Sequence, residues 1–378
     1  MHHKIHLWFT IVFCVGLLGV GIYNVIKPAN AFSQTENRQL AQAPELNLQT
    51  ILSGEFMKSF ETYSTDQFVG RDAFVSLKAR CERLLGKAEN NGVYFADHDY
   101  LIEKQAPLDE RTLTNNLNAL SKVDALKKYN LSFLLIPTSY EINQSYLPAN
   151  AYQPVQQDIL SFTREKLADT DVTLIDPTPA LTAHQDEYLY YRTDHHQTSL
   201  GSYYVYQYYC EQMGLTPLSL DDFDRQTLSD SFYGSTWSKS MLSMPPDTVE
   251  AFIPKQPASY HVDYLDENRQ SDSLYEMDNL NIKDKYTVFL DGNHAQIRID
   301  GAVKNGKKLA VLKDSYAHSL LPFLANHYEE IHVFDLRYYN YNVLDYLDEQ
   351  GITDVLAIYN VSNFNTDVNM VKFGAFVG

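Results

Sequence analysis

The chain has 378 residues, of which 44% are hydrophobic and 21% are charged, so it can bury a full core and has the composition of a globular protein. Its formal net charge of −18, together with the lack of any run of Lys or Arg, argues against a surface that follows the phosphates of a nucleic acid. We therefore expect no nucleic-acid partner.

An uncharged apolar run from Leu7 to Ile26 is about long enough, as a helix, to cross the roughly 30 Å hydrocarbon core of a bilayer. Lys4 with the amino terminus on one side and Lys27 on the other weakly favour a cytoplasmic N-terminus. The sequence Ala29-Asn30-Ala31 could be cut by a signal peptidase, but the run is longer than the apolar part of most signal peptides. We expect residues 1–27 to anchor the chain, with the rest outside the cytoplasm; a cleaved signal is the alternative.

The three cysteines do not form a disulfide scaffold. Cys14 lies in the apolar run, and Cys81 and Cys210 make one possible external pair. No spacing of Cys and His is typical of a zinc site. Because Cys81 shares a helical stripe with Phe74 and Leu77, we expect it to be a buried core thiol.

Residues 28–105 are predicted to form a stalk region with a polar linker, two helices and a hairpin. The two helical stripes run from Leu52 to Tyr63 and from Phe74 to Leu84. In residues 91–102, two short aromatic runs flank Asp97-His98-Asp99, which predicts a hairpin. This trio could bind a cation, but we interpret it as a surface turn.

From residue 106 to residue 378, short apolar runs alternate with helical patterns. Such runs are typical of strands in a parallel sheet that is covered on both faces. The fold class is therefore predicted to be α/β, with a parallel sheet covered by helices on both faces. The predicted strands are 131–136, 172–175, 286–290, 308–312, 330–334 and 354–359, the clearest helix is 198–213, and the weakly periodic residues 215–278 are expected to be an insertion.

One stretch carries two of the three groups that nucleophilic catalysis needs. Asp194, His195 and His196 stand immediately before a helix-start signal at Thr198 and Ser199. A carboxylate and a histidine held in one turn form two thirds of a nucleophilic triad. On residue types alone, His195 and His196 are equal candidates for the base.

Ser315 has the best context for the missing nucleophile. Parallel sheets bind ligands beyond the carboxyl ends of their strands, and Lys313-Asp314-Ser315-Tyr316 connects strand 308–312 directly to a helix. Backbone N–H groups at that helix start could face a developing oxyanion. Taken alone, Ser315 is more simply a helix cap; the carboxylate and histidines elsewhere on the same sheet favour the nucleophile.

Other residues that follow strands are candidate binding groups. Arg337 could hold a carboxylate or acyl oxygen, or only form a surface ion pair. Asn293 and Asn360 could each donate an amide to an oxyanion, or be turn residues. Tyr316 could line an acyl pocket or simply pack. Residues 232–239 place aromatics beside hydroxyls, which suggests either a sugar-binding rim or an ordered loop.

Together these motifs resemble the DHHW family of bacterial exported proteins, relatives of the alginate O-acetylation proteins in the SGNH esterase and acetyltransferase superfamily. The resemblance rests on Asp194-His195-His196 and Lys313-Asp314-Ser315-Tyr316, and it covers most of the chain. Gln197 departs from the family, which has Trp after the second His. Further similar stretches are 35–40, 66–72, 91–94 and 289–294.

The resemblance implies an SGNH hydrolase-like fold in which Asp194 orients His196, His196 is the general base and Ser315 attacks an acyl carbonyl. His195 would then point away. The resemblance also implies a membrane-bound O-acyltransferase as the partner that supplies acyl groups. We expect no cofactor and no catalytic metal, because two adjacent histidines rarely reach one ion.

The sequence thus leads to two hypotheses. The first is an extracytoplasmic serine-dependent O-acetyltransferase or acetylesterase that acts on a cell-envelope or secreted polysaccharide through an acyl-enzyme. Transfer and hydrolysis stay open, since both use the same acyl-enzyme. The alternative is a non-catalytic protein of polysaccharide binding or assembly in the cell envelope.

Overall fold

The computed structural model describes residues 2–33, 35–151, 156–256 and 258–377. The chain divides into two compact units, and each is described by itself. The first comprises Met1–Lys87 and Ser238–Ser243, and the second comprises Ala88–Trp237 and Met244–Gly378.

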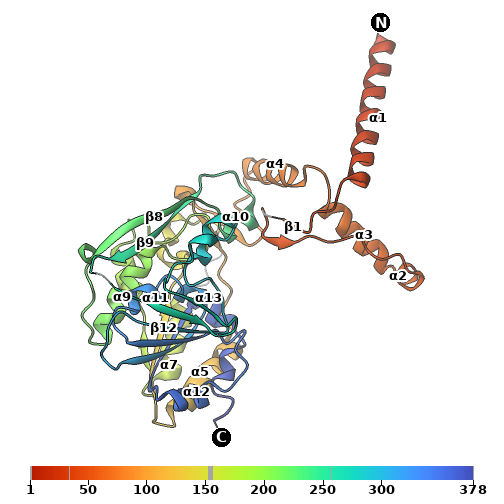
Figure 1. The fold of residues 1–378 in the computed structure, drawn as a ribbon. Coiled ribbons are helices and arrows are strands. Elements are labelled where there is room, and N and C mark those ends of the chain that lie inside the picture. Colours follow the sequence, from red (N-terminus) through yellow and green to blue (C-terminus); the bar gives the residue numbers. More distant parts are fainter. Residues whose placement is uncertain (1, 34, 152–155, 257, 378) are drawn as a thin grey trace. The chain divides into compact units, whose positions relative to one another are not determined.

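The first unit begins with a long apolar helix, α1 (His2–Ile26), shown in red in Figure 1. Its segment Ile5–Ile26 is long and apolar enough to cross a membrane or to be a signal sequence. Three further helices follow, and Gly54 and Gly70 separate them, both in left-handed conformations with φ of 79° and 71°. These helices are α2 (Leu48–Leu52), α3 (Glu55–Asp66) and α4 (Arg71–Leu84), and the short strands β1 (Phe32–Ser33) and β2 (Arg38–Gln39) pair antiparallel.

The prediction that Cys81 is a buried thiol is wrong. Cys81 is exposed, and so are Phe74 and Leu77 on the same stripe of α4. Only Ala79 of this helix is buried. The apolar periodicity identified the helix correctly, but periodicity does not say whether another element covers the apolar face.

The second unit contains an eight-stranded, mostly parallel sheet. Its strand order is β11-β10-β12-β14-β13-β15-β6-β7. The pairs from β14 through β7 are parallel, whereas the pairs among β11, β10, β12 and β14 are antiparallel. The strands are β6 (Asn130–Ile136), β7 (Thr173–Ile175), β10 (His261–Tyr264), β11 (Arg269–Ser271), β12 (Gln296–Asp300), β13 (Lys308–Lys313), β14 (Glu330–Phe334) and β15 (Asp354–Asn360). The predicted α/β class is confirmed, and the antiparallel edge is an addition to it.

Alternate side chains of each central strand enter two separate cores, as the period of two in a strand requires. In β6, Leu134 and Ile136 pack into a core with α9 (Ser199–Gln212) and α11 (Leu321–Leu324). Phe133 and Leu135 pack into the other core. That second core includes residues from α5 (Glu110–Asp124), α7 (Gln156–Leu167), α12 (Val343–Gln350) and α13 (Val361–Thr366).

The prediction of a strand at 286–290 is wrong. Those residues form the 3-10 turn η5 (Lys285–Val288), followed by Leu290, Asp291 and Gly292 with φ of 53°, 57° and 77°. Tyr286, Val288, Phe289 and Leu290 are all buried, so an apolar run in a buried turn imitated a strand. The strand of this region, β12, begins only at Gln296.

Residues 215–278 contain strands that the weak periodicity did not reveal. β8 (Phe223–Phe232) and β9 (Asp247–Pro254) form an antiparallel hairpin, while β10 and β11 extend the central sheet. Most of β8 is polar and exposed, which explains the weak pattern. The predicted hairpin at 91–102 is confirmed as β4 (Val93–Phe95) and β5 (Leu101–Glu103) around the turn η1 (Asp97–Asp99), with β3 (Glu89–Asn90) beside β4.

The remaining helices are short. They are α6 (Ser139–Ile142), α8 (Thr178–Ala183) and α10 (Ser235–Ser240), with 3-10 turns η2 (Gln144–Tyr146), η3 (Leu220–Asp222), η4 (Met277–Asn281), η6 (Ser315–Ala317) and η7 (Met370–Lys372).

Candidate active site

The loop before α9 is held by one buried carboxylate, Asp247 at the start of β9. Asp247 accepts hydrogen bonds from Arg192 N (3.0 Å), Thr193 N (2.7 Å) and Thr193 Oγ1 (2.5 Å), and one from the Tyr188 hydroxyl. Its burial raises the pKa of its carboxyl, although these donors act in the opposite direction. The loop ends where the Thr198 side chain caps α9 by accepting from Gly201 N. The chain on either side of residues 194–196 is thus fixed.

Asp194, His196 and Ser315 form one hydrogen-bonded chain. His196 Nδ1 lies 2.5 Å from Asp194 Oδ1, and His196 Nε2 lies 2.7 Å from Ser315 Oγ. Because a carboxylate only accepts, the proton of neutral His196 belongs on Nδ1, which leaves Nε2 to accept from the serine hydroxyl. Asp194 and His196 are only 3% and 6% exposed, so bulk water does not compete for these bonds.

The electrostatics keep His196 neutral and Asp194 ionised near pH 7. Burial lowers the pKa of His196 to about 4, His195 adds to this effect, and Asp194 opposes it. Burial alone would raise the pKa of Asp194, but the two imidazoles and the hydrogen bonds from His196 and Ser235 lower it below its usual range. Neutral imidazole is the form that can accept a proton from a hydroxyl.

Packing fixes the ring of His196 and the carboxylate of Asp194. The His196 ring stacks on Tyr286, with centroids 3.8 Å apart and planes at 9°. The Tyr286 hydroxyl donates to Ser315 O over 3.1 Å. Asp194 Oδ2 accepts from Ser235 N over 2.7 Å, and Gly234 packs so closely that a Cβ there would collide with the Asp194 side chain.

His195, the other candidate base, has different partners. Its Nδ1 lies 2.6 Å from Ser235 Oγ, and its backbone oxygen accepts from the Tyr316 hydroxyl over 2.5 Å. Within the described part of the chain, His195 makes no hydrogen bond to Ser315. The structure therefore places His196, and not His195, next to the serine.

Ser315 lies at the first residue of η6, directly after β13. The preceding Asp314 is buried and ties this turn to the neighbouring strand end. It accepts from Tyr316 N (2.9 Å), Asn360 N (2.9 Å), Asn360 Nδ2 (2.7 Å) and Asn363 Nδ2 (3.0 Å). Ser315 N donates to none of the residues that the structure describes, so this N–H is available to a ligand.

Asn360, predicted as an oxyanion donor, acts here as a structural link. Its amide nitrogen donates to Asp314, and its Oδ1 accepts from Asn363 N over 2.9 Å as the cap of α13. Sequence position placed Asn360 correctly at the edge of the sheet near Ser315. It did not reveal that the side chain is already used.

Asn293 and Arg337 come together in a neighbouring cluster, with Lys313 and Asp335. Arg337 donates to both carboxylate oxygens of Asp335 and, over 2.9 Å, to Asn293 Oδ1. Lys313 Nζ lies 3.2 Å from Asn293 Oδ1 and from Asp335 Oδ2. Burial lowers the pKa of Lys313 to about 8. As placed, Arg337 and Asn293 bind these neighbours and not Ser315.

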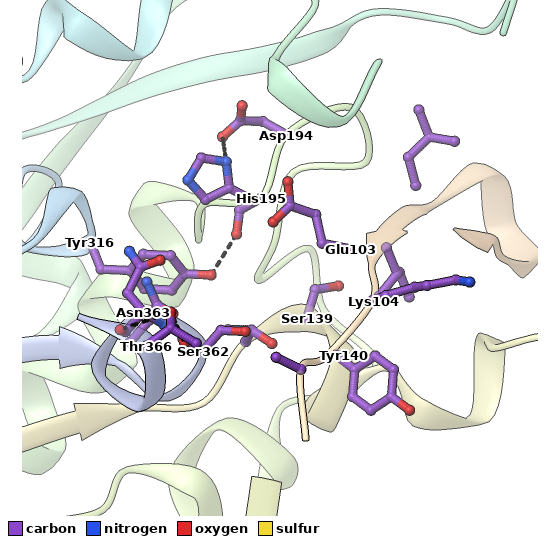
Figure 2. A pocket seen from close by; sticks show the side chains of 15 residues that line it. Glu103, Lys104, Ser139, Tyr140, Asp194, His195, Tyr316, Ser362, Asn363 and Thr366 are labelled. Atoms are coloured by element: carbon purple, nitrogen blue, oxygen red, sulfur yellow. Dashed lines mark hydrogen bonds and ion pairs between the residues drawn. The ribbon is translucent and has the colours of Figure 1, made fainter. Parts of the chain in front are cut away.

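A cavity of about 150 Å³ opens beside Asp194, His195 and Tyr316 (Figure 2). Three other parts of the chain complete it: β5 with the residues after it, the residues after β6, and the end of β15 with α13. The lining is rich in polar groups, including Glu103, Lys104, Thr138, Ser139, Asn360, Ser362, Asn363 and Thr366. This is the carboxyl edge of the parallel strands, where ligands of such sheets bind. Tyr316 lines the cavity, as the sequence suggested.

Asp194, His195 and His196 each offer a ligand atom to a metal within 4.8 Å of one another. Both ring nitrogens of His196 are already engaged, by Asp194 and by Ser315. A metal there would have to break the chain that leads to Ser315, so the geometry favours the nucleophilic arrangement over a metal centre.

Sequence reasoning missed Asp247, Ser235, Gly234 as a packing partner, and Tyr286 as the ring beneath His196. Residues 232–239 were singled out for their aromatics and hydroxyls, and this segment does supply the Ser235 N–H to Asp194. Asp247 had no signal, because its partners, among them the backbone N–H groups of Thr193 and Arg192, lie 54 and 55 residues away in the chain.

The family model of the DHHW proteins matches residues 96–334, a range that includes Asp194, His196 and Ser315. The chain belongs to the DHHW family. A solved DHHW family protein from Eubacterium siraeum is 26% identical, with a TM-score of 0.64 over 75% of this chain and 95% of that one. The structure of Bacillus cereus PatB1 with a sulfonyl adduct is 20% identical, with a TM-score of 0.64 over 74% of this chain and 98% of that one.

A third structure, the O-acetyltransferase domain of Pseudomonas putida AlgJ, is 13% identical, with a TM-score of 0.46 over 73% of this chain and 93% of that one. No curated protein sequence matches the chain. The match to the family model confirms the predicted family membership. Gln197 stands where the family has Trp after the second His. It is fully buried and donates to Ser202 Oγ over 2.8 Å, so it fills a packing position beside α9.

Proposed function

We propose that this DHHW protein is a serine-dependent O-acyltransferase or esterase with an SGNH hydrolase-like fold, which moves an acetyl group onto or off a cell-envelope or secreted polysaccharide. The observation that carries the proposal is the hydrogen-bonded chain from Asp194 through His196 to Ser315. A neutral imidazole between a carboxylate and a hydroxyl is the arrangement that activates a serine.

In the first half of the proposed reaction, His196 Nε2 takes the proton of Ser315 as Oγ attacks the acyl carbonyl. The free Ser315 N–H supports the negative charge that develops on the carbonyl oxygen. Collapse of the tetrahedral intermediate expels the alcohol of the donor, which receives the proton from Nε2. Ser315 then carries the acyl group as an ester.

In the second half, an acceptor hydroxyl from a sugar or from water gives its proton to His196 Nε2 and attacks the ester. Ser315 leaves and recovers that proton. Asp194 stabilises the imidazolium in each half by remaining ionised. Which acceptor reaches the ester decides between transfer and hydrolysis.

The cavity beside Tyr316 supports a hydroxyl-rich acceptor, because its lining offers hydroxyl, amide and charged groups. Arg337, Asn293 and Asn360 would each have to give up present hydrogen bonds to bind the acyl group. We therefore assign them to the support of the Ser315 turn and its neighbouring cluster.

The apolar helix α1 supports a site outside the cytoplasm, with the chain either anchored by a single span or released after cleavage. An acyl donor must then be supplied from the membrane side. A membrane-bound O-acyltransferase is the partner that this arrangement suits.

The test is acetylester hydrolysis by the full chain in detergent, with Ser315→Ala compared to Ser229→Ala, a matched change on an exposed strand. We expect Ser315→Ala to lose at least about 10³-fold in kcat and Ser229→Ala to keep wild-type turnover. Equal turnover of Ser315→Ala and wild type would contradict the proposal. Glycan binding without turnover by the wild type would instead favour the non-catalytic alternative.

A further inference from the structure

A second group of candidate metal ligands, Glu267, Asp291 and His294, lies outside the proposed triad. One ligand atom of each lies within 4.8 Å of the others. Glu267 belongs to the turn between β10 and β11, and Asp291 and His294 belong to the turn between η5 and β12. The left-handed conformations at 290–292 reverse the chain there and set Asp291 and His294 on the same side.

His294 is the informative member of this group. It is 4% exposed, and its Nδ1 lies 3.1 Å from Asp266 Oδ1. Because that carboxylate can only accept, Nδ1 carries a proton, and Nε2 is the ring nitrogen that can offer a lone pair to a ligand. Nε2 is buried and has no hydrogen-bond partner among the described residues, and it faces Asp291 Oδ2 at 3.5 Å.

A buried, unpartnered nitrogen needs an explanation, since such groups cost free energy. A bound cation supplies one. Histidines that bind metals almost always donate their other ring N–H to a carboxylate or carbonyl, which fixes the tautomer and the ring. Asp266 does this for His294, and Ala295 N holds Asp266 in place over 2.7 Å.

The charges around His294 also favour a cation. Arg269 contacts three carboxylates, those of Glu267, Glu276 and Asp291, and Asp266 adds a fourth. Arg269 thus faces three of these carboxylates, and Asp266 faces His294 instead, so the carboxylates outnumber the one guanidinium. Asp291 accepts from Arg269 and, over 2.6 Å, from Asn279 Nδ2, which orient its carboxylate and leave lone pairs on its oxygens.

We propose that His294 Nε2, Asp291 and Glu267 bind one divalent first-row metal ion of the Zn²⁺ or Mn²⁺ type. One imidazole with two carboxylates suits these ions better than the all-oxygen preference of Ca²⁺ or Mg²⁺. The ion joins the β10–β11 turn to the turn that follows η5. It thereby steadies the segment that carries Tyr286 beneath His196.

The test is isothermal titration of the metal-stripped full chain in detergent with ZnCl₂ and with MnCl₂. We expect one equivalent of at least one ion to bind, with loss of binding in His294→Ala and a reduction of about 10–100-fold in Asp266→Asn. His261→Ala is the matched control, because His261 also lies between two carboxylates, Asp263 and Asp272, but its side chain is 37% exposed. It should bind as the wild type does.

Glu267→Gln covers the case in which His294→Ala does not fold, since Glu267 is exposed and its loss should weaken binding with an unchanged circular dichroism spectrum. Ser315→Ala should bind the ion as the wild type does, so the metal site is tested independently of the proposed catalysis. Absence of binding by the wild type, or undiminished binding by folded His294→Ala or Glu267→Gln, would overturn the proposal.

Discussion

Replacing Asp194 by Asn tests how the carboxylate controls the proton of His196. Asp194 accepts three hydrogen bonds: His196 N (3.0 Å) and His196 Nδ1 (2.5 Å) on Oδ1, and Ser235 N (2.7 Å) on Oδ2. An amide has one accepting oxygen and one donating nitrogen. Wherever the amide nitrogen lies, it faces at least one N–H donor.

Both orientations of the new amide are costly. With its nitrogen toward Ser235, a partly buried backbone donor loses its partner, which costs on the order of 1 kcal/mol of stability. With its nitrogen toward His196, the ring must accept at Nδ1 and carry its proton on Nε2, the wrong tautomer to take the proton of Ser315. Comparable exchanges in serine triads lower kcat about 10⁴-fold, and we expect a loss on the order of 10³–10⁴-fold here.

The assay is kcat for an acetyl ester, measured with the melting temperature so that loss of fold is separated from loss of chemistry. Asp247→Asn is the matched control, because Asp247 is a buried carboxylate that holds the same loop without touching His196. It should lower the melting temperature comparably and kcat far less. A tenfold or smaller loss of kcat in folded Asp194→Asn would refute this reasoning.

Two further predictions concern the same carboxylate and imidazole. Gly234→Ala places a Cβ against Asp194, so we expect about 1–3 kcal/mol of destabilisation and a loss of activity on the order of 10²-fold, by melting curves and ester turnover. In the control Gly19→Ala, the new Cβ meets nothing within 4 Å, so stability and activity should not change. Equal effects of Gly234→Ala and Gly19→Ala would contradict the close packing of Gly234 against Asp194. Because burial lowers the pKa of His196 to about 4 and only the neutral ring accepts a proton, kcat/KM should hold from pH 7 to about pH 5 and fall below pH 4. A half-maximal kcat/KM near pH 6.5 would show that the pKa of His196 is not lowered.

The sequence was most informative where residue type and strand position pointed the same way. Asp194 and His196 were singled out from their residue types just before a helix start, and Ser315 from its place after a strand. The structure brings the three within hydrogen-bond distance. The choice between His195 and His196 needed the family resemblance, because spacing along the chain does not define which ring turns toward a residue 119 positions away.

The sequence was least informative where one side chain satisfies distant backbone groups. Asp247 and Asp314 hold turns through such bonds. Asp247 lies in no recognisable pattern, and the motif that contains Asp314 did not reveal which groups its carboxylate binds. Arg337 follows β14 as predicted, whereas the strand predicted before Asn293 is a turn. Asp335, which accepts from Arg337, was not anticipated. The strand predicted at 286–290 is wrong for a different reason: this turn is buried, so its residues are as apolar as those of a strand.

The central claim is that Ser315 becomes acylated. The most direct measurement is intact-protein and peptide mass spectrometry of the full chain after brief incubation with an acetyl donor ester and acid quenching. We expect an added acetyl group on the peptide that contains Ser315 and no such group in Ser315→Ala. The acetyl group should be lost when an acceptor glycan is added or after longer incubation in water. An acetyl group on another residue, or none while the ester is still turned over, would contradict the central claim.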